Sequence, residues 1–458
     1  MPEDLATRPL PNWYNDAKLG IMIHWGPFTI PAWAERTLDP EVIFTDETSP
    51  DYFLTPQGVE SFLRRNPYSE WYWNSMSIEG SAASEHHREV WGAEFPYQRF
   101  GPMFTDGLDT WKPTEWAELF RDAGARYVVL VTKHHDGYVL WPSDMVNPNR
   151  EGWSSRRDVV GELSDAVRGE CLQMGLYYSG GIDWTFLEPP FSTFLDALRL
   201  TPTQPEYARY VDEHWRELIE RYRPAILWND ITAPALSDSE ALFREYYAAV
   251  PDGVVNDRWG GQPGEIHRDF ATAEFSGRPG IDSGKWEAVR GMGRGFGFNQ
   301  NERAEDYGTP EKFIHMLVDI VSKNGNLLLN VGPRADGSIP DEQRAILEGL
   351  GRWLGTNGEA IYGTRPWRTF GGSTVEGVPL RFTWKAERGS LYAIVLGDVA
   401  AGGSLTFADV LETPFRVGLL GGGSSLAFSR TAEGLRVSLP DGLADAPAYA
   451  LEIVLGEG

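Results

Sequence analysis

The chain has 458 residues, a formal net charge of −25 and a pI of about 4.7. This length exceeds what one hydrophobic core usually serves, so we expect two domains. The negative charge repels phosphate backbones and anionic lipid, which argues against binding to nucleic acid or to a membrane surface. With one cysteine, Cys171, an intramolecular disulfide is impossible.

The N-terminal residues 1–13 carry acids and prolines instead of a basic start followed by an apolar run. No apolar stretch of the sequence has membrane-spanning length. We therefore expect a cytoplasmic protein, while secretion after removal of a signal peptide stays open.

Aromatic residues are abundant, with 18 Trp, 18 Tyr and 22 Phe. Sugar rings expose apolar C–H faces that stack on aromatic planes, so this composition suits a carbohydrate cleft. Ordinary core packing explains the same numbers, and composition alone does not decide between the two.

The first three-quarters of the chain alternates amphipathic helices with short apolar strands. Helical patterns begin at Pro113 and cover Val159–Val167, Tyr207–Tyr222 and Phe313–Ile320. Strand patterns follow them at Tyr127–Thr132, Leu176–Ser179, Ala225–Asn229 and Asn326–Val331. This alternation predicts a parallel sheet that is buried on both faces.

Polar residues gather where these strands end. They are His134, His135, Ser179, Asp183, Asn229, Asp230 and Asn330. A Rossmann sheet would need a glycine-rich turn of the G-x-G-x-x-G kind, which we do not find, whereas a barrel collects its active site at strand ends. We therefore predict an α/β fold with a (β/α)8-like, TIM-type catalytic barrel over residues 1–362.

After Trp353 the pattern changes, and from about Trp367 onward helical periodicity disappears. Short alternating runs lie between glycine-rich turns, at Leu380–Trp384, Leu391–Leu396, Leu435–Leu439 and Ala450–Leu455. They predict a C-terminal antiparallel β-sandwich over residues 363–458. It contains no histidine, so we expect it to serve packing.

Three histidines stand at predicted strand ends. His24 closes the run I-M-I-H, and His134 and His135 close V-L-V-T-K-H-H. Neighbours on a strand face opposite ways, so both of the pair reach a barrel centre only if the strand has ended. A site and a hydrogen-bonded structural role both remain open for them. His86 and His87 lie in a polar helical stretch and are expected to be solvent-facing or structural.

Metal binding is the weaker interpretation of these histidines. The chain has no H-x-H, H-x-x-E-H or H-E-x-x-H spacing. We expect no metal and no other cofactor, and we keep a metal-dependent barrel hydrolase as an alternative.

Two carboxylates are candidates for catalysis. Asp230 ends the apolar run I-L-W-N-D, where local sequence supports a nucleophile and a helix N-cap equally well. Glu274 stands between Ala273 and Phe275, and apolar neighbours favour the protonated form that a general acid needs, although an exposed loop glutamate would look alike. Two such carboxyls are the minimum equipment for glycoside hydrolysis.

Nine motifs in the same order resemble glycoside hydrolase family 29, the α-L-fucosidases. They are W-Y-N-D-A-K-L-G-I-M-I-H-W-G-P, E-W-Y-W-N-S-M, T-K-H-H-D-G-Y-V-L-W-P-S, G-L-Y-Y-S-G-G-I-D-W, I-L-W-N-D, V-N-D-R-W-G, D-F-A-T-A-E-F, K-W-E-A-V-R-G-M-G-R-G-F-G-F-N-Q-N-E and N-G-N-L-L-L-N-V-G-P. They are spread over most of residues 10–365.

The resemblance implies a retaining, exo-acting α-L-fucosidase with Asp230 as nucleophile and Glu274 as acid/base, with Phe275 in place of the usual tyrosine. It implies that sugar hydroxyls are held by His24, Glu70, His134, His135 and Tyr177, with Tyr178 as the other choice for the tyrosine. It further implies that Trp71 packs beside Glu70, that Arg258 lies near both carboxylates, and that the apolar face of the sugar meets Trp228 and Phe296.

The implied partner is a fucosylated glycoside or oligosaccharide, with no nucleic acid and no membrane, and a homo-oligomer stays open. Arg36–Asn66 is longer than such enzymes lead us to expect, and we interpret it as a lid or a subsite wall. A non-catalytic, sugar-binding relative is the second alternative.

Overall fold

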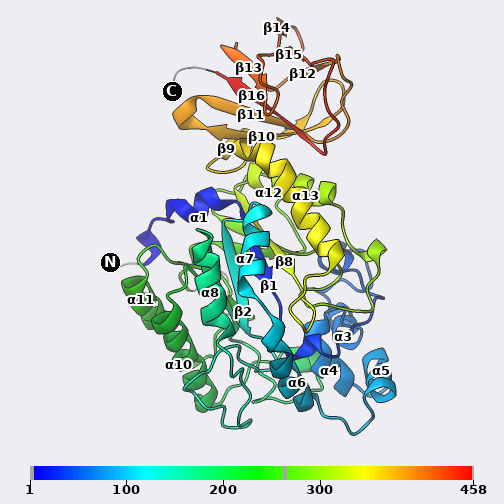
Figure 1. The fold of residues 1–458 in the computed structure, drawn as a ribbon, viewed down its shortest axis with the longest axis vertical. Coiled ribbons are helices and arrows are strands. Elements are labelled where there is room, and N and C mark those ends of the chain that lie inside the picture. The colour runs from blue at the N-terminus through cyan, green and yellow to red at the C-terminus, as the bar shows by residue number, and fades with distance from the viewer. Residues whose placement is uncertain (1–4, 261–265, 456–458) are drawn as a thin grey trace.

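The computed structural model describes residues 5–260 and 266–455, which form an α/β barrel and a β-sandwich (Figure 1). One eight-stranded parallel sheet builds the barrel, in the order β5-β4-β3-β2-β1-β8-β7-β6. Its strands are β1 (Leu19–Ile23), β2 (Tyr127–Lys133), β3 (Gln173–Ser179), β4 (Ile226–Asp230), β5 (Val254–Val255), β6 (Ala271–Glu274), β7 (Trp286–Gly291) and β8 (Gly325–Val331). The predicted parallel sheet is confirmed.

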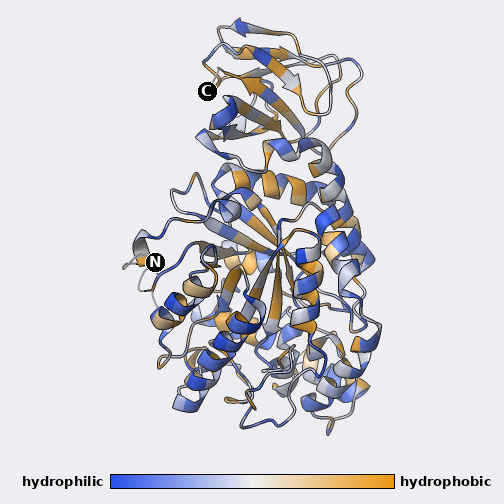
Figure 2. Ribbon diagram, turned by 60° about the vertical axis from the view of Figure 1, so that its left-hand side comes forward, coloured by the Kyte–Doolittle hydropathy of each residue, from blue (hydrophilic) through white to orange (hydrophobic). Residues whose placement is uncertain are grey.

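Helices cover the outer face of this sheet because each presents one apolar stripe to it. They are α7 (Pro113–Asp122), α8 (Val159–Gly169), α10 (Pro205–Tyr222), α11 (Ser239–Ala249), α12 (Pro310–Ser322) and α13 (Asp341–Asn357), with the short α1 (Asn12–Ala17) and α9 (Phe194–Ala197) beside them. Figure 2 shows the apolar strands gathered inside this layer. Within the described ranges no helix follows β5 or β6, so the barrel is an incomplete version of the eightfold repeat.

The barrel has a seam between β5 and β6, where the described residues form no strand ladder. One backbone bond crosses it, from Asp269 N to Val255 O at 2.9 Å. Carboxylates supply the other acceptors, since Asp269 Oδ2 accepts from Val255 N at 2.8 Å and Asp257 Oδ1 accepts from Thr272 N at 3.0 Å. Side-chain carboxylates therefore supply hydrogen bonds at this seam that a strand ladder would supply elsewhere in the barrel.

A long insertion follows β1 and carries α2 (Pro40–Thr45), α3 (Pro56–Arg64), α4 (Tyr72–Ser77), α5 (Ala82–Val90) and α6 (Phe100–Gly107). Helices α3 to α6 lie at the end of the molecule opposite the sandwich (Figure 1). Here α3 begins with Pro56 after the cap Thr55, whose side chain accepts from Gly58 N at 2.9 Å.

The C-terminal sandwich is confirmed as two antiparallel sheets. Their orders are β13-β16-β11-β10-β9 and β12-β15-β14. The strands are β9 (Arg365–Ser373), β10 (Pro379–Lys385), β11 (Ser390–Val395), β12 (Ser404–Phe407), β13 (Arg416–Leu419), β14 (Phe428–Thr431), β15 (Gly434–Ser438) and β16 (Tyr449–Val454).

Strand β11 joins the two parts of the molecule because it is buried on both faces. Leu391, Ala393 and Val395 point into the core between the two sheets. Tyr392 and Ile394, on the other face, belong to the core of the barrel and its helices. Burial of both faces explains why β11, although it belongs to an antiparallel sheet, has an almost continuously apolar sequence.

Among the described residues, no helix combines the length and the apolar character that crossing a membrane requires.

Candidate active site

Asp230 is the last residue of β4 and is 8% exposed. It caps no helix, because the chain turns at once through Ile231, at φ +67°, and α11 begins only at Ser239 behind its own cap, Asp238. The N-cap alternative for Asp230 is therefore wrong. Residues two apart on a strand share a face, so Asp230 and Trp228 both point into the barrel.

Three donors surround the Asp230 carboxylate. Tyr177 Oη donates to Oδ2 at 2.5 Å, while Arg258 and the Ile231 amide donate to Oδ1 at 2.7 and 2.9 Å. Burial alone would raise the pKa of this carboxyl, but the Arg258 charge and the Tyr177 hydrogen bond lower it on balance. Asp230 is thus held ionised, as a nucleophile must be.

Arg258 joins the two candidate carboxylates. Its two terminal nitrogens bind Asp230 Oδ1 at 2.7 Å and Glu274 Oε2 at 3.1 Å. Its Nε donates to Thr272 Oγ1 at 3.0 Å, and Thr272 in turn donates to Asp257 at 2.8 Å. Thr272 and Asp257 at the β5–β6 seam therefore hold the guanidinium in place. Arg258 lies between the two carboxylates, as the resemblance led us to expect.

Tyr68 also reaches Glu274 but was absent from the residues singled out in the sequence. Its hydroxyl donates to Glu274 Oε1 at 3.2 Å. Tyr68 stands two residues before Glu70 in the run N-P-Y-S-E-W. Its nearness to Glu70 in sequence is the one signal that could have indicated Tyr68 as a site residue.

The three strand-end histidines come together. The rings of His134 and His135 lie 4.0 Å apart and those of His24 and His134 5.5 Å apart, because β2 ends at Lys133 and releases the pair from strand alternation. Burial lowers the pKa of His24 to about 4 and that of His135 to about 3, and it also lowers the pKa of His134 well below its ordinary value. All three are neutral at neutral pH.

The tautomers of two of them follow from their partners. Ser179 Oγ donates its only proton to Ile182 O, so at 2.7 Å it must accept from His135 Nδ1. Asn330 donates through its amide nitrogen to Phe296 O, so its oxygen accepts from His24 Nδ1 at 2.6 Å. In both rings Nε2 is left as an acceptor for a ligand hydroxyl.

Glu70 lies in the short 3-10 turn Ser69–Trp71 and is 1% exposed. Its Oε2 accepts from Gly297 N at 2.8 Å, and burial raises its pKa to about 8. Trp71 meets the His135 ring edge-on at 5.0 Å. The turn thereby links the inserted helices to the strand-end histidines.

The predicted aromatic contacts separate into two kinds. Phe296 stacks on His24 at 5.0 Å, whereas Trp228, at 2% exposure, lies one layer beneath Asp230, stacked on Tyr177 at 5.4 Å. Arg258 covers the Trp228 ring. In this arrangement Trp228 supports the floor of the site and has little surface left for a ligand.

Tyr177 and Tyr178 face opposite sides of β3. Tyr177 reaches Asp230, but the Tyr178 hydroxyl bonds His214 on the outer helix α10 at 2.9 Å. The structure therefore brings Tyr177 to the candidate site and excludes Tyr178. His87 is structural, bonded to Tyr72 at 3.0 Å, and His86 stacks on Trp33.

The Arg36–Asn66 segment lies beside Glu274. Phe44 on α2 stacks with Phe275 at 6.3 Å, and Phe62 on α3 packs against Tyr68 at 5.5 Å. Arg36 ties the segment to Asp306 at 2.7 Å. The segment packs against residues next to Glu274, and its interpretation as a lid or a subsite wall stays a prediction.

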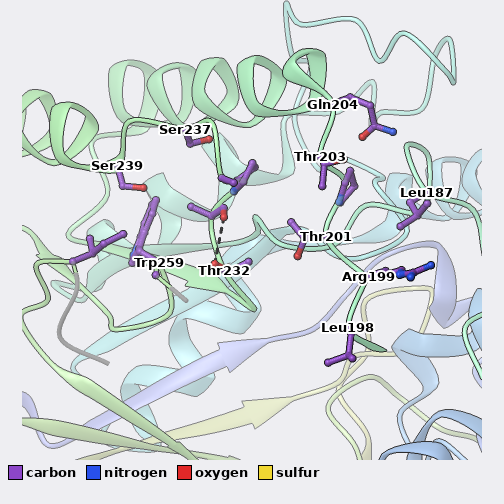
Figure 3. A pocket seen from close by; sticks show the side chains of 16 residues that line it. Leu187, Leu198, Arg199, Thr201, Thr203, Gln204, Thr232, Ser237, Ser239 and Trp259 are labelled. Atoms are coloured by element: carbon purple, nitrogen blue, oxygen red, sulfur yellow. Dashed lines mark hydrogen bonds between the residues drawn. The ribbon is translucent and has the colours of Figure 1, made fainter. Parts of the chain in front are cut away.

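A hollow of about 670 Å³ lies at the same barrel end, between the loops that follow β3 and β4 (Figure 3). Thr201, Gln204, Thr232 and Trp259 are among its lining residues. Thr232 stands two residues after Asp230 in the chain, but neither Asp230 nor Glu274 lines this hollow. In the described part of the chain, no group of three or more His, Cys, Asp or Glu could hold a metal ion.

Comparison with known proteins identifies the family. The family model described as alpha-L-fucosidase matches residues 2–359. The chain belongs to the α-L-fucosidase family. It is 33% identical over 410 residues to the alpha-L-fucosidase of Dictyostelium discoideum, covering 86% of this chain and 79% of that protein. It is 32% identical over 448 residues to the human tissue alpha-L-fucosidase, covering 95% and 86%.

Solved structures of this family share the whole fold. Those of the Thermotoga maritima α-fucosidase in complex with fucose and with a mechanism-based inhibitor each have a TM-score of 0.86 and 38% identity, and cover 99% of both chains. The resemblance to glycoside hydrolase family 29 is confirmed, and the protein is a glycoside hydrolase. These relatives favour neither the metal-dependent nor the non-catalytic alternative.

Proposed function

We propose that this α-L-fucosidase releases terminal α-L-fucose by double displacement, with Asp230 as nucleophile and Glu274 as acid/base. The observation that carries the proposal is the single guanidinium of Arg258, which binds one oxygen of each carboxylate. A pair of carboxyls with separate environments is what a retaining glycosidase uses.

In the first step Asp230 attacks the anomeric carbon and the bond to the leaving oxygen breaks. Glu274 gives its proton to that oxygen, so the aglycone departs as a neutral alcohol and a fucosyl ester remains on Asp230. Tyr177 and Arg258, the two side-chain donors on Asp230, keep it ionised until it attacks.

In the second step water attacks the same carbon while Glu274, now ionised, takes a proton from the water; the ester bond to Asp230 breaks, so that fucose leaves and Asp230 is again a carboxylate. Esterification has removed the negative charge of Asp230, which favours the ionised form of Glu274 at this stage. Each step inverts the anomeric carbon, so the configuration of the sugar is retained.

Recognition of the sugar rests on the neutral histidines and the buried turn. The Nε2 atoms of His24 and His135 accept from hydroxyls, and the His134 ring, 4.0 Å from that of His135, completes the group. Glu70 and Trp71 complete the polar side, with Phe296 against the apolar face and the C5 methyl. The substrate is a fucosylated glycoside or oligosaccharide.

We also propose that the functional division of the chain falls between residues 362 and 363, just before β9 begins at Arg365. All the residues assigned here to the reaction then lie in the barrel part.

Turnover of an aryl α-L-fucoside by wild type and by Asp230→Ala tests the proposal. We expect kcat to fall by roughly a thousandfold or more, because no other group can form the ester. Asp238→Ala, which removes a helix cap from the same loop, is the matched control and should cost about 1 kcal/mol of stability with near-normal turnover.

An inactive wild type, or an Asp230→Ala enzyme with ordinary activity, would overturn the assignment. The metal-dependent alternative predicts that exhaustive chelation abolishes turnover, whereas we expect turnover to survive it.

A further inference from the structure

We propose that Tyr68 is a positioning residue that aims the acid proton of Glu274 at the leaving oxygen. This inference rests on the proposed function, in which Glu274 is the acid/base. Tyr68 lies in the long insertion between β1 and β2, just after the Arg36–Asn66 segment and outside the strand-end motifs.

The geometry around Glu274 gives each carboxyl oxygen its own donor. Arg258 donates to Oε2 at 3.1 Å, and Tyr68 Oη donates to Oε1 at 3.2 Å. The Arg258 pKa is raised by Asp230 and Glu274 although burial opposes this, so the guanidinium never gives up its proton. The positive charge of Arg258 disfavours a proton on Oε2 more than the neutral phenol of Tyr68 disfavours one on Oε1, so the acid form carries its proton on Oε1, the oxygen that faces Tyr68.

Oε1 has two lone-pair directions, and Tyr68 donates into one of them. The acid proton must then occupy the other, which is the direction left for a substrate oxygen. When Glu274 is ionised in the second step, the same hydroxyl stabilises the charge on Oε1. One phenol thus serves both forms of the carboxyl.

Packing prevents the Tyr68 ring from swinging away. Tyr68 is 4% exposed, and its ring lies 5.2 Å from that of Phe296 and 5.5 Å from that of Phe62. On a third side Phe275 stacks with it at 6.3 Å. The hydroxyl is consequently presented to Glu274 from a fixed direction.

Several other titratable or charged groups act on Glu274. They are Arg258 at the β5–β6 seam, Arg290 on β7, Glu70 in the 3-10 turn and Tyr177 on β3. Asp230 on β4 shares Arg258 with Glu274. Tyr68→Phe leaves all of these charges in place and keeps the ring. Its effects therefore report the hydroxyl alone.

The experiment compares Tyr68→Phe, Glu274→Ala and Tyr72→Phe as purified full-length proteins. For Tyr68→Phe we expect kcat/KM to fall about 10-fold or more for a fucoside with a sugar leaving group, and less than about 3-fold for one with a nitrophenol leaving group, which needs no acid. The inhibition constant of free fucose should stay within about 2-fold of wild type, since Tyr68 binds no sugar hydroxyl in this assignment.

The pH profile supplies a second readout. Loss of a donor to ionised Glu274 should move the basic limb of kcat/KM up by about half to one pH unit. Replacement of Tyr68 by 3-fluorotyrosine, whose hydroxyl donates more strongly, should move the limb the opposite way and covers the case in which Tyr68→Phe folds poorly. Tyr72→Phe removes a buried hydroxyl that bonds His87 instead, and should move neither limb.

Equal losses for both leaving groups, with the basic limb unmoved, would overturn the role of Tyr68 and leave the proposed function standing. Glu274→Ala separates the two ideas: we expect a strong dependence on the leaving group and partial rescue of the second step by azide. If Glu274→Ala shows neither, the acid/base assignment fails, and the role of Tyr68 fails with it.

Discussion

At the scale of single residues, burial and partners together set the charge states in the site. Asp230 and Glu70 are both buried carboxyls, yet their pKa values move in opposite directions. Asp230 has Arg258 against it, whereas Glu70 accepts from the backbone amide of Gly297 and forms no ion pair within residues 5–260 and 266–455. A single guanidinium thus decides which of the two carboxyls is ionised at neutral pH.

Glu70 gives a prediction on stability against pH. In the folded protein the Glu70 carboxyl keeps its proton up to about pH 8, whereas the ordinary pKa of this group is 4.5. Between these values the folded state binds the extra proton, so wild type loses stability as the pH rises. Glu70→Gln has no proton to lose, and its stability relative to wild type should increase with pH, by at most about 1.4 kcal/mol per pH unit.

Urea unfolding of both proteins at pH 5, 6.5 and 8 measures this difference. All other titrations are common to the pair and cancel. A difference that is constant across the three pH values would show that Glu70 does not hold a proton in the empty site.

At the scale of elements, the site depends on how β2 and β3 end. Lys133, the last residue of β2, binds Asp183 in the loop after β3 at 2.9 Å, and both side chains are fully buried. Asp183 also accepts from Thr185, and Trp184 N donates to His135 O at 2.7 Å. The ion pair therefore fixes the loop against the turn that presents His134 and His135.

Breaking this pair on one side should be costly. Lys133→Met leaves Asp183 charged and buried, which we expect to reduce the free energy of unfolding by about 3–5 kcal/mol. The double variant Lys133→Met/Asp183→Asn removes that charge and should recover part of the loss. Urea unfolding of wild type, both single variants and the double variant measures the coupling; a loss below about 1 kcal/mol for Lys133→Met would contradict this role.

The Arg36–Asn66 segment shows how an inserted element enters a site. Its helices contribute Phe44 and Phe62, which pack against Phe275 and Tyr68 instead of meeting the candidate nucleophile. Apolar periodicity in α3 marks the buried face, but only the three-dimensional contacts show which residues it supports.

At the scale of the whole molecule, the sandwich completes the barrel's outer layer. Trp353 on α13 donates to Ala448 O at 2.9 Å, and Arg381 binds Asp319 on α12 at 2.6 Å. Tyr392 and Ile394 of β11 lie in the same core as these helices. The packing role assigned to this part from its lack of histidine agrees with these contacts.

A chain ending at Tyr362 should therefore aggregate or unfold. It would expose the apolar surface of α12 and α13 that the sandwich covers, and contiguous apolar surface of this kind drives association. Size-exclusion chromatography and thermal unfolding of the truncated and full-length proteins test this. A monomeric, cooperatively folded fragment would show that the barrel part is stable by itself.

The sequence by itself determined the class of each part, because periods of 3.6 and 2.0 residues follow from backbone geometry alone. It also placed Asp230, the three histidines and Asn330 at strand ends, where a parallel barrel brings side chains together. The family motifs then selected Glu274 and Arg258. The fold and the family could be inferred in this way because both depend on local order along the chain, whereas the roles of the site residues stay predictions.

Only the tertiary structure decided how these groups act on one another. That Asp230 caps no helix, that Tyr177 and not Tyr178 faces inward, and that Trp228 lies under the site all depend on where separate strands meet. Tyr68 reaches Glu274 across 206 positions of sequence, and no local pattern encodes such a contact. Hydrogen bonds and charges act over a few ångströms of space, so the fold, more than the spacing of residues, sets their chemistry.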